Sequence, residues 1–253
     1  MCGRYVQTKT GQWIAEQRQG VLPDDVEVKP SWNIAPTSTV PILMETLTEG
    51  AEISREVRTA RWGLLPHWAK DQKLSYKTFN ARSETVTEKP TFRSAVRRQR
   101  CAVPATAYYE WYKPQGGGKI PHAVIPDDDS QILFAGLWET WTEPATGALV
   151  PSCTILTGPA PDPAMQEDLY WLHDRTPLAL NEDTAAEWMR PDDLSKPQAA
   201  ELVDHIRAAS PDVTEHWMVY EIDKAVGHVR NNDPTLLQPV SLNAGPSWTA
   251  QDS

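Results

Sequence analysis

The sequence predicts an α+β fold, in which a mostly antiparallel, barrel-like β-sheet core is flanked by helices. Short apolar segments of strand character recur along the whole chain, and helical periodicity is confined to stretches between them. No segment repeats and no long linker interrupts the chain. We therefore expect one domain over residues 1–240 and a flexible tail over residues 241–253.

The predicted elements alternate along the chain. Strands are expected at residues 4–8, 40–46, 53–63, 101–113, 121–126, 132–141, 152–157 and 216–222. Helices are expected at residues 11–19, 162–171 and 194–210, with helix-like turns at residues 94–100. The helix at 194–210 is the clearest, because Ser195 can cap it and Leu202, Val203 and Ile206 share one face.

Composition narrows the class of protein. The 253 residues suffice for a substantial core, and no run of about 20 apolar residues predicts a membrane span. The N-terminus lacks the pattern of a signal peptide. Three distant cysteines form neither a disulfide framework nor a zinc ribbon, and six histidines show no metal-ligand spacing. We expect a cytoplasmic monomer that needs no metal or cofactor.

The charge is unevenly distributed. The chain carries −10 overall, whereas residues 58–100 hold eleven Lys or Arg and three Asp or Glu, a net +8. An acidic protein of this kind can present a local basic surface to a nucleic acid. The alternative is that these basic side chains are dispersed around the fold.

Cys2 is the first candidate for chemistry. Removal of Met1, which a small second residue favours, would leave a free α-amine and a thiol on adjacent carbons. The amine can condense with an aldehyde to an imine, and the thiol can then close a five-membered thiazolidine. The alternative is that cysteine occupies this position by chance.

Asn80 and Arg82 lie in the segment FNARSE. In an extended segment they would share a face, where the amide could orient a reactant and the guanidinium could bind a phosphate. The alternative is an Asn-mediated turn before a helix.

Glu110 lies within YYEWY, on a predicted strand. Aromatic neighbours would desolvate its carboxyl group and suit it to general acid–base catalysis. Strand alternation could instead turn it to solvent, and spacing alone does not decide.

His173 lies in WLHDRTPLAL, where the chain is expected to leave a helix and enter a strand before Pro177. A histidine at such a junction can transfer protons near neutral pH. A structural role is the alternative.

Trp62, Trp68 and Phe92 are interleaved with the basic residues of the 58–100 stretch. Aromatic faces and cations together suit single-stranded nucleic acid, because bases stack on the rings and phosphates pair with the cations. Trp62 reads as a core residue.

Short sequence motifs that include these candidate residues occur in an ordered series along the chain. It runs MCGR, WNIAP, RWGLLPHW, FNARSET, CAVPATAYYEW, AGLWE, HDRTPLAL and AVGHVRNN. The series resembles the SRAP (SOS response-associated peptidase) family from Cys2 to about Val240. The resemblance implies covalent capture of abasic sites in single-stranded DNA, within the DNA damage response of a bacterial cytoplasm at the nucleoid and replication fork.

The resemblance also implies roles for individual residues. Cys2 would form the crosslink, Asn80 would position it, and Glu110 and His173 would transfer protons. The implied DNA contacts are Arg4, Trp68, Arg82, Phe92 and Arg93. Trp68-Ala69 stands where close bacterial relatives can have two adjacent tryptophans, which weakens the expected base contacts there.

The sequence is also compatible with other functions. The chain could be a thiol peptidase that uses Cys2 with His173, or a non-covalent reader of single-stranded or modified DNA that does not need Cys2. A lyase activity could accompany crosslinking. The tail shows no clear motif for binding a replication clamp.

Overall fold

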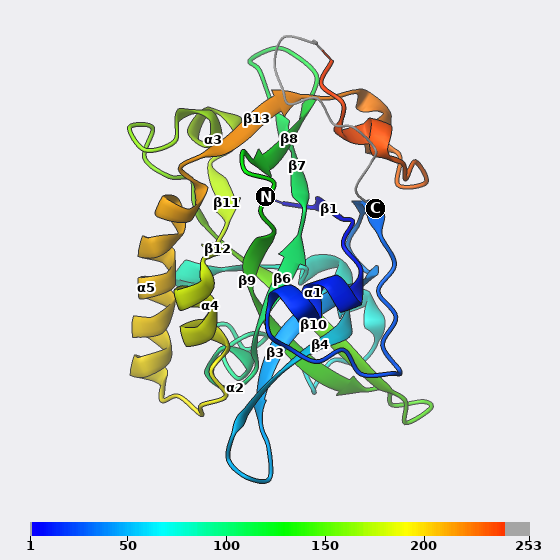
Figure 1. The fold of residues 1–253 in the computed structure, drawn as a ribbon, viewed down its shortest axis with the longest axis vertical. Helices are drawn as coiled ribbons and strands as arrows, with labels where there is room; N and C mark the ends of the chain where they lie inside the picture. Colours follow the sequence, from blue (N-terminus) through cyan, green and yellow to red (C-terminus); the bar gives the residue numbers. More distant parts are fainter. Residues whose placement is uncertain (1, 241–253) are drawn as a thin grey trace.

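The computed structural model describes residues 2–240 and has the α+β architecture expected from the sequence (Figure 1). The strands are β1 (Arg4–Gln7), β2 (Ser31–Ile34), β3 (Thr39–Leu47), β4 (Ile53–Trp62), β5 (Asn80–Arg82), β6 (Arg100–Ala105), β7 (Ala107–Tyr112), β8 (Ile120–Pro126), β9 (Ile132–Thr142), β10 (Leu149–Pro159), β11 (Arg175–Pro177), β12 (Ala179–Leu180) and β13 (Trp217–Glu221). The α-helices are α1 (Gly11–Gln17), α2 (Ala95–Arg98), α3 (Glu167–Leu172), α4 (Glu182–Met189) and α5 (Lys196–Thr214). The 3₁₀-helices are η1 (Gln72–Lys77), η2 (Ser83–Thr85), η3 (Lys224–Gly227) and η4 (Pro234–Leu237).

The larger sheet closes on itself as a barrel. Its strands pair in the order β10-β4-β3-β6-β9, and a further pairing of β9 with β10 completes the circle. These pairs are antiparallel except β4 with β10, and the short strand β5 also runs parallel to β10. The predicted barrel-like sheet is therefore confirmed, and closure leaves these strands without an exposed edge.

Side chains alternate between the two faces of the barrel. On β3, Ile42 and Met44 join one hydrophobic cluster, whereas Leu43 between them joins another. The cluster that contains Leu43 also holds Trp188 of α4 and Ile206 of α5, so helices cover the outer face. The period of two along each strand thus supplies both the interior of the barrel and the surface on which the helices pack.

A second, five-stranded antiparallel sheet lies against one end of the barrel, in the order β13-β8-β7-β1-β2 (Figure 1). Tyr5 and Tyr108 point from it into the cluster that fills the barrel, where Tyr5 meets Trp62 edge to face at 5.0 Å. Val6 and Tyr109 point the other way and pack with residues of η3 and η4. Both faces are buried, which explains why apolar and aromatic residues occupy both faces of β1, β7 and β8.

Two predicted elements differ from the structure. The run 101–113 was expected to be one strand but is β6 and β7, because the chain leaves its barrel partner β9 at Ala105 and pairs with β1 from Ala107. The helix expected at 162–171 is only Glu167–Leu172. Asp162 precedes a proline, and its side chain accepts the Ala164 N–H in a turn instead.

The sequence prediction missed α4 and correctly placed α5. Asn181 and Thr184 form a capping box at the start of α4, a signal that the sequence contains. Ser195 caps α5 as expected, with Val203 and Ile206 buried and Leu202 packed at the edge of the same cluster.

The tail at 241–253 lies outside the described residues. None of the helices within residues 2–240 is long and apolar enough to cross a membrane.

Gly63 joins β4 to the loop that follows, and we predict that Gly63→Ala strongly destabilises the protein. Its φ is +136°, and a Cβ there would collide with the Ser75 carbonyl oxygen and lie 2.7 Å from Ser75 Cβ. We expect a loss of about 3 kcal/mol in the free energy of unfolding, measured by urea denaturation. Gly147, with φ +72° and open space around it, is the control; Gly147→Ala should cost only about 1 kcal/mol. Equal losses would contradict this account.

Candidate functional site

The pairing of β1 with β7 places Cys2 at the junction of the two sheets. Arg4 pairs with Tyr109 and Tyr5 with Tyr108, so the antiparallel ladder carries the start of the chain toward Glu110. Cys2 is completely buried, and its Sγ lies 3.7 Å from the Arg4 carbonyl oxygen. The thiol is therefore held inside the protein and is not displayed on its surface.

Asn80 contacts Cys2 from the barrel side. It begins β5, which pairs with β10, and its Nδ2 donates a hydrogen bond of 2.6 Å to the Cys2 carbonyl oxygen. The Trp62 indole nitrogen donates to the Phe79 carbonyl at 2.9 Å and so holds the preceding residue in place. Asn80 Oδ1 is buried and accepts no hydrogen bond from the described residues, which leaves it able to receive one from a ligand.

Glu110 contributes a buried carboxylate beside the thiol. It is 6% exposed, so the alternative that it faces solvent is wrong. One oxygen, Oε1, accepts the Trp111 N–H at 3.1 Å. Burial, and to a smaller extent the nearby Glu110 carboxylate, raise the pKa of the Cys2 thiol to about 12, because both disfavour a negative charge on the sulfur.

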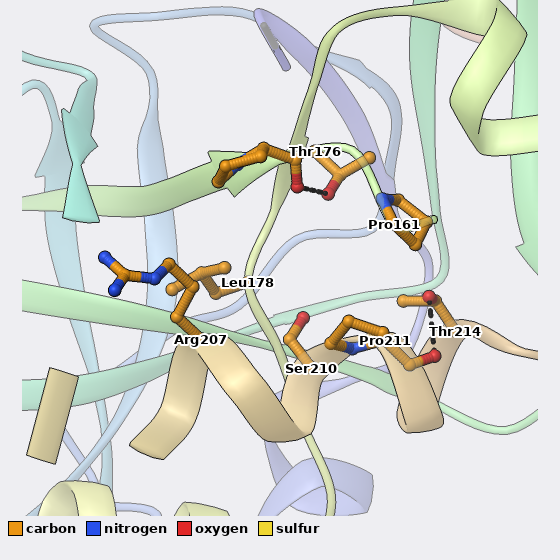
Figure 2. Close-up of a pocket in the computed structure, with 8 residues that line it drawn as sticks. Pro161, Thr176, Leu178, Arg207, Ser210, Pro211 and Thr214 are labelled. Atoms are coloured by element: carbon orange, nitrogen blue, oxygen red, sulfur yellow. Dashed lines mark hydrogen bonds between the residues drawn. The ribbon is translucent and has the colours of Figure 1, made fainter. Parts of the chain in front are cut away.

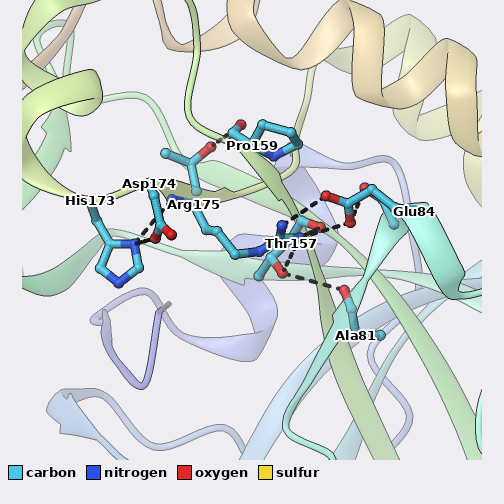
Figure 3. Close-up of polar contacts among 9 residues, drawn as sticks. Ala81, Glu84, Thr157, Pro159, His173, Asp174 and Arg175 are labelled. Atoms are coloured by element: carbon cyan, nitrogen blue, oxygen red, sulfur yellow. Dashed lines mark hydrogen bonds and ion pairs between the residues drawn. The ribbon is translucent and has the colours of Figure 1, made fainter.

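His173 ends α3 and precedes β11, as the sequence predicted. Its Nδ1 accepts the Arg175 main-chain N–H at 3.0 Å and also lies 2.7 Å from Asp174 Oδ1 (Figure 3). The first contact suits a neutral ring with its proton on Nε2, and the second suits a protonated ring. Burial lowers the pKa of His173, while the Glu110 carboxylate opposes this, so the neutral ring prevails at pH 7.

Arg175 braces the turn that carries His173, although no sequence pattern marked it as a site residue. Its guanidinium donates to both carboxylate oxygens of Glu84, at 2.8 and 2.9 Å, and to the Thr157 carbonyl oxygen at 2.8 Å (Figure 3). These bonds lower the pKa of Glu84. The sequence does show Arg175 directly after His173-Asp174 and Glu84 within FNARSE. The spacing of these two residues, however, does not predict that they form an ion pair.

The four residues expected to carry chemistry therefore meet at one place. Asn80 touches Cys2 directly, and the Glu110 carboxylate acts electrostatically on both Cys2 and His173. They come from β5, β7, the start of the chain and the end of α3. Such a group can orient an N-terminal residue, move protons at it and exclude water from it.

The arginines predicted to contact DNA occupy different settings. The Arg4 guanidinium donates to Asn33 Oδ1 and to the Val226 carbonyl oxygen, both at 2.8 Å, and lies 5.9 Å from the centre of the Trp111 ring. Arg4 therefore ties β1 to β2 and η3. Arg82 is exposed two residues after Asn80, on the same strand.

Trp68 lies on a separate loop beside an open groove of about 380 Å³. The indole is 48% exposed, and three lysines line the groove with it: Lys70, Lys73 and Lys77. The loop is anchored from below, where the Trp141 indole nitrogen donates to the Ala69 carbonyl oxygen at 2.8 Å. This part of the basic stretch is a preformed cationic and aromatic surface.

Phe92 and Arg93 precede α2. Phe92 is half-buried and packs against the cluster that the helices cover, so its ring is largely committed to packing. Arg93 is exposed. Their part in DNA contact stays a prediction.

Two further features lie apart from these residues. Between α5 and β11, a cavity of about 10 Å³ has room for a single water molecule and is lined by Thr176, Leu178, Ser210 and Pro211, among others (Figure 2). Within residues 2–240 no group of three or more His, Cys, Asp or Glu side chains is placed to hold a metal ion.

Comparison with known proteins identifies relatives over nearly the whole chain. The abasic site processing protein YoqW of Bacillus subtilis (strain 168) is 32% identical over 240 residues, which cover 94% of this chain and 99% of YoqW. The abasic site processing protein HMCES of Gallus gallus is 30% identical over 257 residues, which cover 91% of this chain and 70% of HMCES.

Solved structures share the fold. A crystal structure of a protein from Bacteroides thetaiotaomicron matches with a TM-score of 0.73 at 24% identity and covers 95% of this chain and 100% of its own. The sequence profile of the family described as SOS response associated peptidase (SRAP) matches residues 1–229. With that match and these relatives, the chain belongs to the SRAP family.

Proposed function

We propose that this protein processes abasic sites in DNA, and that it captures them covalently in single strands through an N-terminal Cys2. The observation that carries the proposal is the 2.6 Å hydrogen bond from Asn80 to the Cys2 carbonyl oxygen, formed beside the buried Glu110. This bond fixes the residue that would bear the amine and thiol once Met1 is removed. The names of the relatives, abasic site processing proteins, support the same substrate.

The first chemical step joins the Cys2 amine to the opened sugar. An abasic deoxyribose opens to an aldehyde at C1′, and the neutral α-amine attacks that carbon to form a carbinolamine. Loss of water then gives an imine. His173 is suited to take a proton as the sugar hemiacetal opens, because its lowered pKa keeps the ring neutral at pH 7.

The second step closes the ring and protects the strand. The thiol sulfur adds to the imine carbon, its proton passes to a nearby base, and the nitrogen takes up a proton to give a neutral thiazolidine. Glu110 is the carboxylate next to the thiol and suits the role of this base. Closure competes with β-elimination from the imine, which would cut the DNA, so a nearby thiol favours capture over strand cleavage.

The raised pKa of Cys2 distinguishes this chemistry from that of a thiol peptidase. Thiol peptidases rely on a thiolate stabilised by a neighbouring imidazolium, with a lowered pKa. Here burial moves the pKa of Cys2 upward to about 12. This environment favours a neutral thiol that adds to an adjacent imine over a thiolate that is present in the resting protein.

The basic stretch of the chain suits a single strand. Arg82 and the groove of Trp68 with its lysines lie on the stretch of net charge +8. Cations there can pair with phosphates, and the exposed indole can stack on an unpaired base. A duplex would keep its bases stacked inside and would leave the indole without a partner.

Cys2→Ala should abolish the stable crosslink. The variant keeps an amine but lacks the thiol, so an imine can form but cannot be closed into a ring. We would mix each protein with single-stranded DNA bearing one abasic site, run a denaturing gel and measure intact masses. Cys153→Ala removes another buried thiol and should crosslink as the wild type does. A Cys2→Ala crosslink of wild-type yield would overturn the proposal, and strand cleavage by this variant would support an imine intermediate.

Asn80→Ala should slow crosslinking by about tenfold to a hundredfold, because the hydrogen bond to the Cys2 carbonyl is lost and the amine is no longer held. Single-turnover rates on the same DNA measure the effect. Asn181→Ala is the control, since its Oδ1 accepts the Thr184 N–H at 2.9 Å at the start of α4, which packs on the outer face of the barrel. Equal rates for both variants would contradict the positioning role of Asn80.

The reactivity of Cys2 toward iodoacetamide should keep rising with pH beyond 9. Only the thiolate is alkylated, and burial holds the pKa of this thiol near 12, so its thiolate fraction still increases tenfold per pH unit where a free thiol has levelled off. Mass spectrometry of the N-terminal peptide, native against denatured, provides the rates. A plateau near pH 9 in the native protein would show that the thiol is not desolvated.

A further inference from the structure

Tyr112, His122 and Trp171 form an aromatic cluster at the edge of the site. Trp171 lies 5.0 Å from Tyr112 and 5.2 Å from His122, measured between ring centroids, with the planes at 87° and 79°. Tyr112 and His122 are 6.4 Å apart at 89°. All three contacts are edge to face, so no ring of the cluster is stacked flat on another.

The cluster adjoins the proposed catalytic residues through the chain itself. Tyr112 follows Glu110 by two positions on β7 and so lies on the same face of the sheet. Trp171 precedes His173 by two positions, in α3, which packs against β7 and β13 (Figure 1). His122 pairs with Glu110 across β7 and β8. A ligand whose sugar reached Glu110 and His173 would bring its neighbouring group to these rings.

The indole is held in place although it is partly exposed. Trp171 Nε1 donates to Asp168 Oδ1 at 3.0 Å within α3, and the His122 Nδ1–H donates to the Ile120 carbonyl oxygen at 3.1 Å. Even so, 38% of Trp171 is exposed, whereas Leu172 next to it is buried. A large apolar ring that is fixed and still accessible is a preorganised surface for a flat ligand.

The charges around the cluster select the kind of ligand. Glu167 and Asp168 lie in the first turn of α3 and disfavour a phosphate over the indole. Lys113 follows Tyr112 and acts electrostatically on His173, so a cation lies on the β7 side. An uncharged aromatic ring fits the indole, with its phosphate directed toward Lys113.

We propose that Trp171, supported by Tyr112, stacks on the base next to the abasic nucleotide and so sets the register of the sugar over Cys2. The inference rests on the proposed function and adds a specificity to it. A purine presents a larger face than a pyrimidine, so lesions with a neighbouring purine should bind more tightly.

The test uses single-stranded DNA with a tetrahydrofuran in place of the abasic sugar, because it binds without an aldehyde and cannot crosslink. A 2-aminopurine is placed 5′ or 3′ of it in separate strands. Trp171→Leu keeps apolar bulk without a stacking face, and we expect it to bind about tenfold more weakly and to lose quenching of one of the two probes. Trp171→Phe should retain most of the binding affinity and most of the 2-aminopurine quenching. Tyr170→Ala removes an exposed ring outside the cluster and should match the wild type.

Wild-type affinity and quenching in Trp171→Leu would overturn the inference, as would an equal loss in Tyr170→Ala. Crosslinking of true abasic DNA at saturating protein separates this outcome from failure of the proposed function. Trp171→Leu should then crosslink more slowly than the wild type, because the sugar is no longer held in register, but should still form the crosslink that Cys2→Ala cannot form. If the wild type itself forms no crosslink, covalent capture fails whatever the stacking probes report.

Discussion

The antiparallel pairing of β1 with β7 is the constraint on which the site depends. It fixes the first residues of the chain by main-chain hydrogen bonds and carries them to the strand that holds Glu110. Tyr5, in the same short strand, inserts into the barrel and meets Trp62 at 5.0 Å. The first strand, β1, begins at Arg4 and lies between β2 and β7 inside the sheet, so it is paired on both sides and holds Cys2 two residues away.

The closed barrel forms the side of the candidate site that faces β1 and β7. Trp62 ends β4 inside it and hydrogen-bonds the residue before Asn80, so the amide that reaches Cys2 is supported from within the core. Closure through β9 and β10 makes this support rigid, because no strand of the barrel can slide without breaking pairs on both sides. The positions of Asn80 and Cys2 thus depend on packing between the two sheets, and a loss of packing at Trp62 would disturb both residues.

Much of the fold and of the candidate site could be predicted from the sequence. The features that could not be predicted depend on contacts between distant parts of the chain. Strand character and the capped helix after Ser195 are local properties, so they were predicted well. The break between β6 and β7 was not, because a continuous apolar run does not reveal that its two halves pair in different sheets. The ion pair of Arg175 with Glu84 joins positions 91 residues apart, which no local pattern encodes. Glu110 needed the structure for the same reason, since only the packing of α3 over β7 decides which face is covered.

Burial of the thiol has a consequence for selectivity under the proposed function. A thiol whose pKa lies near 12 is almost entirely protonated at neutral pH, so its reactivity toward electrophiles in solution is very low. An imine on the adjacent amine is different, because its carbon is presented to the sulfur within the same residue, and proximity replaces acidity as the source of rate. The lowered pKa of His173 serves the same end by keeping its ring neutral and able to accept a proton. The site is then reactive only toward a carbonyl that first binds at the N-terminus, and recognition of the DNA strand governs which carbonyl that is.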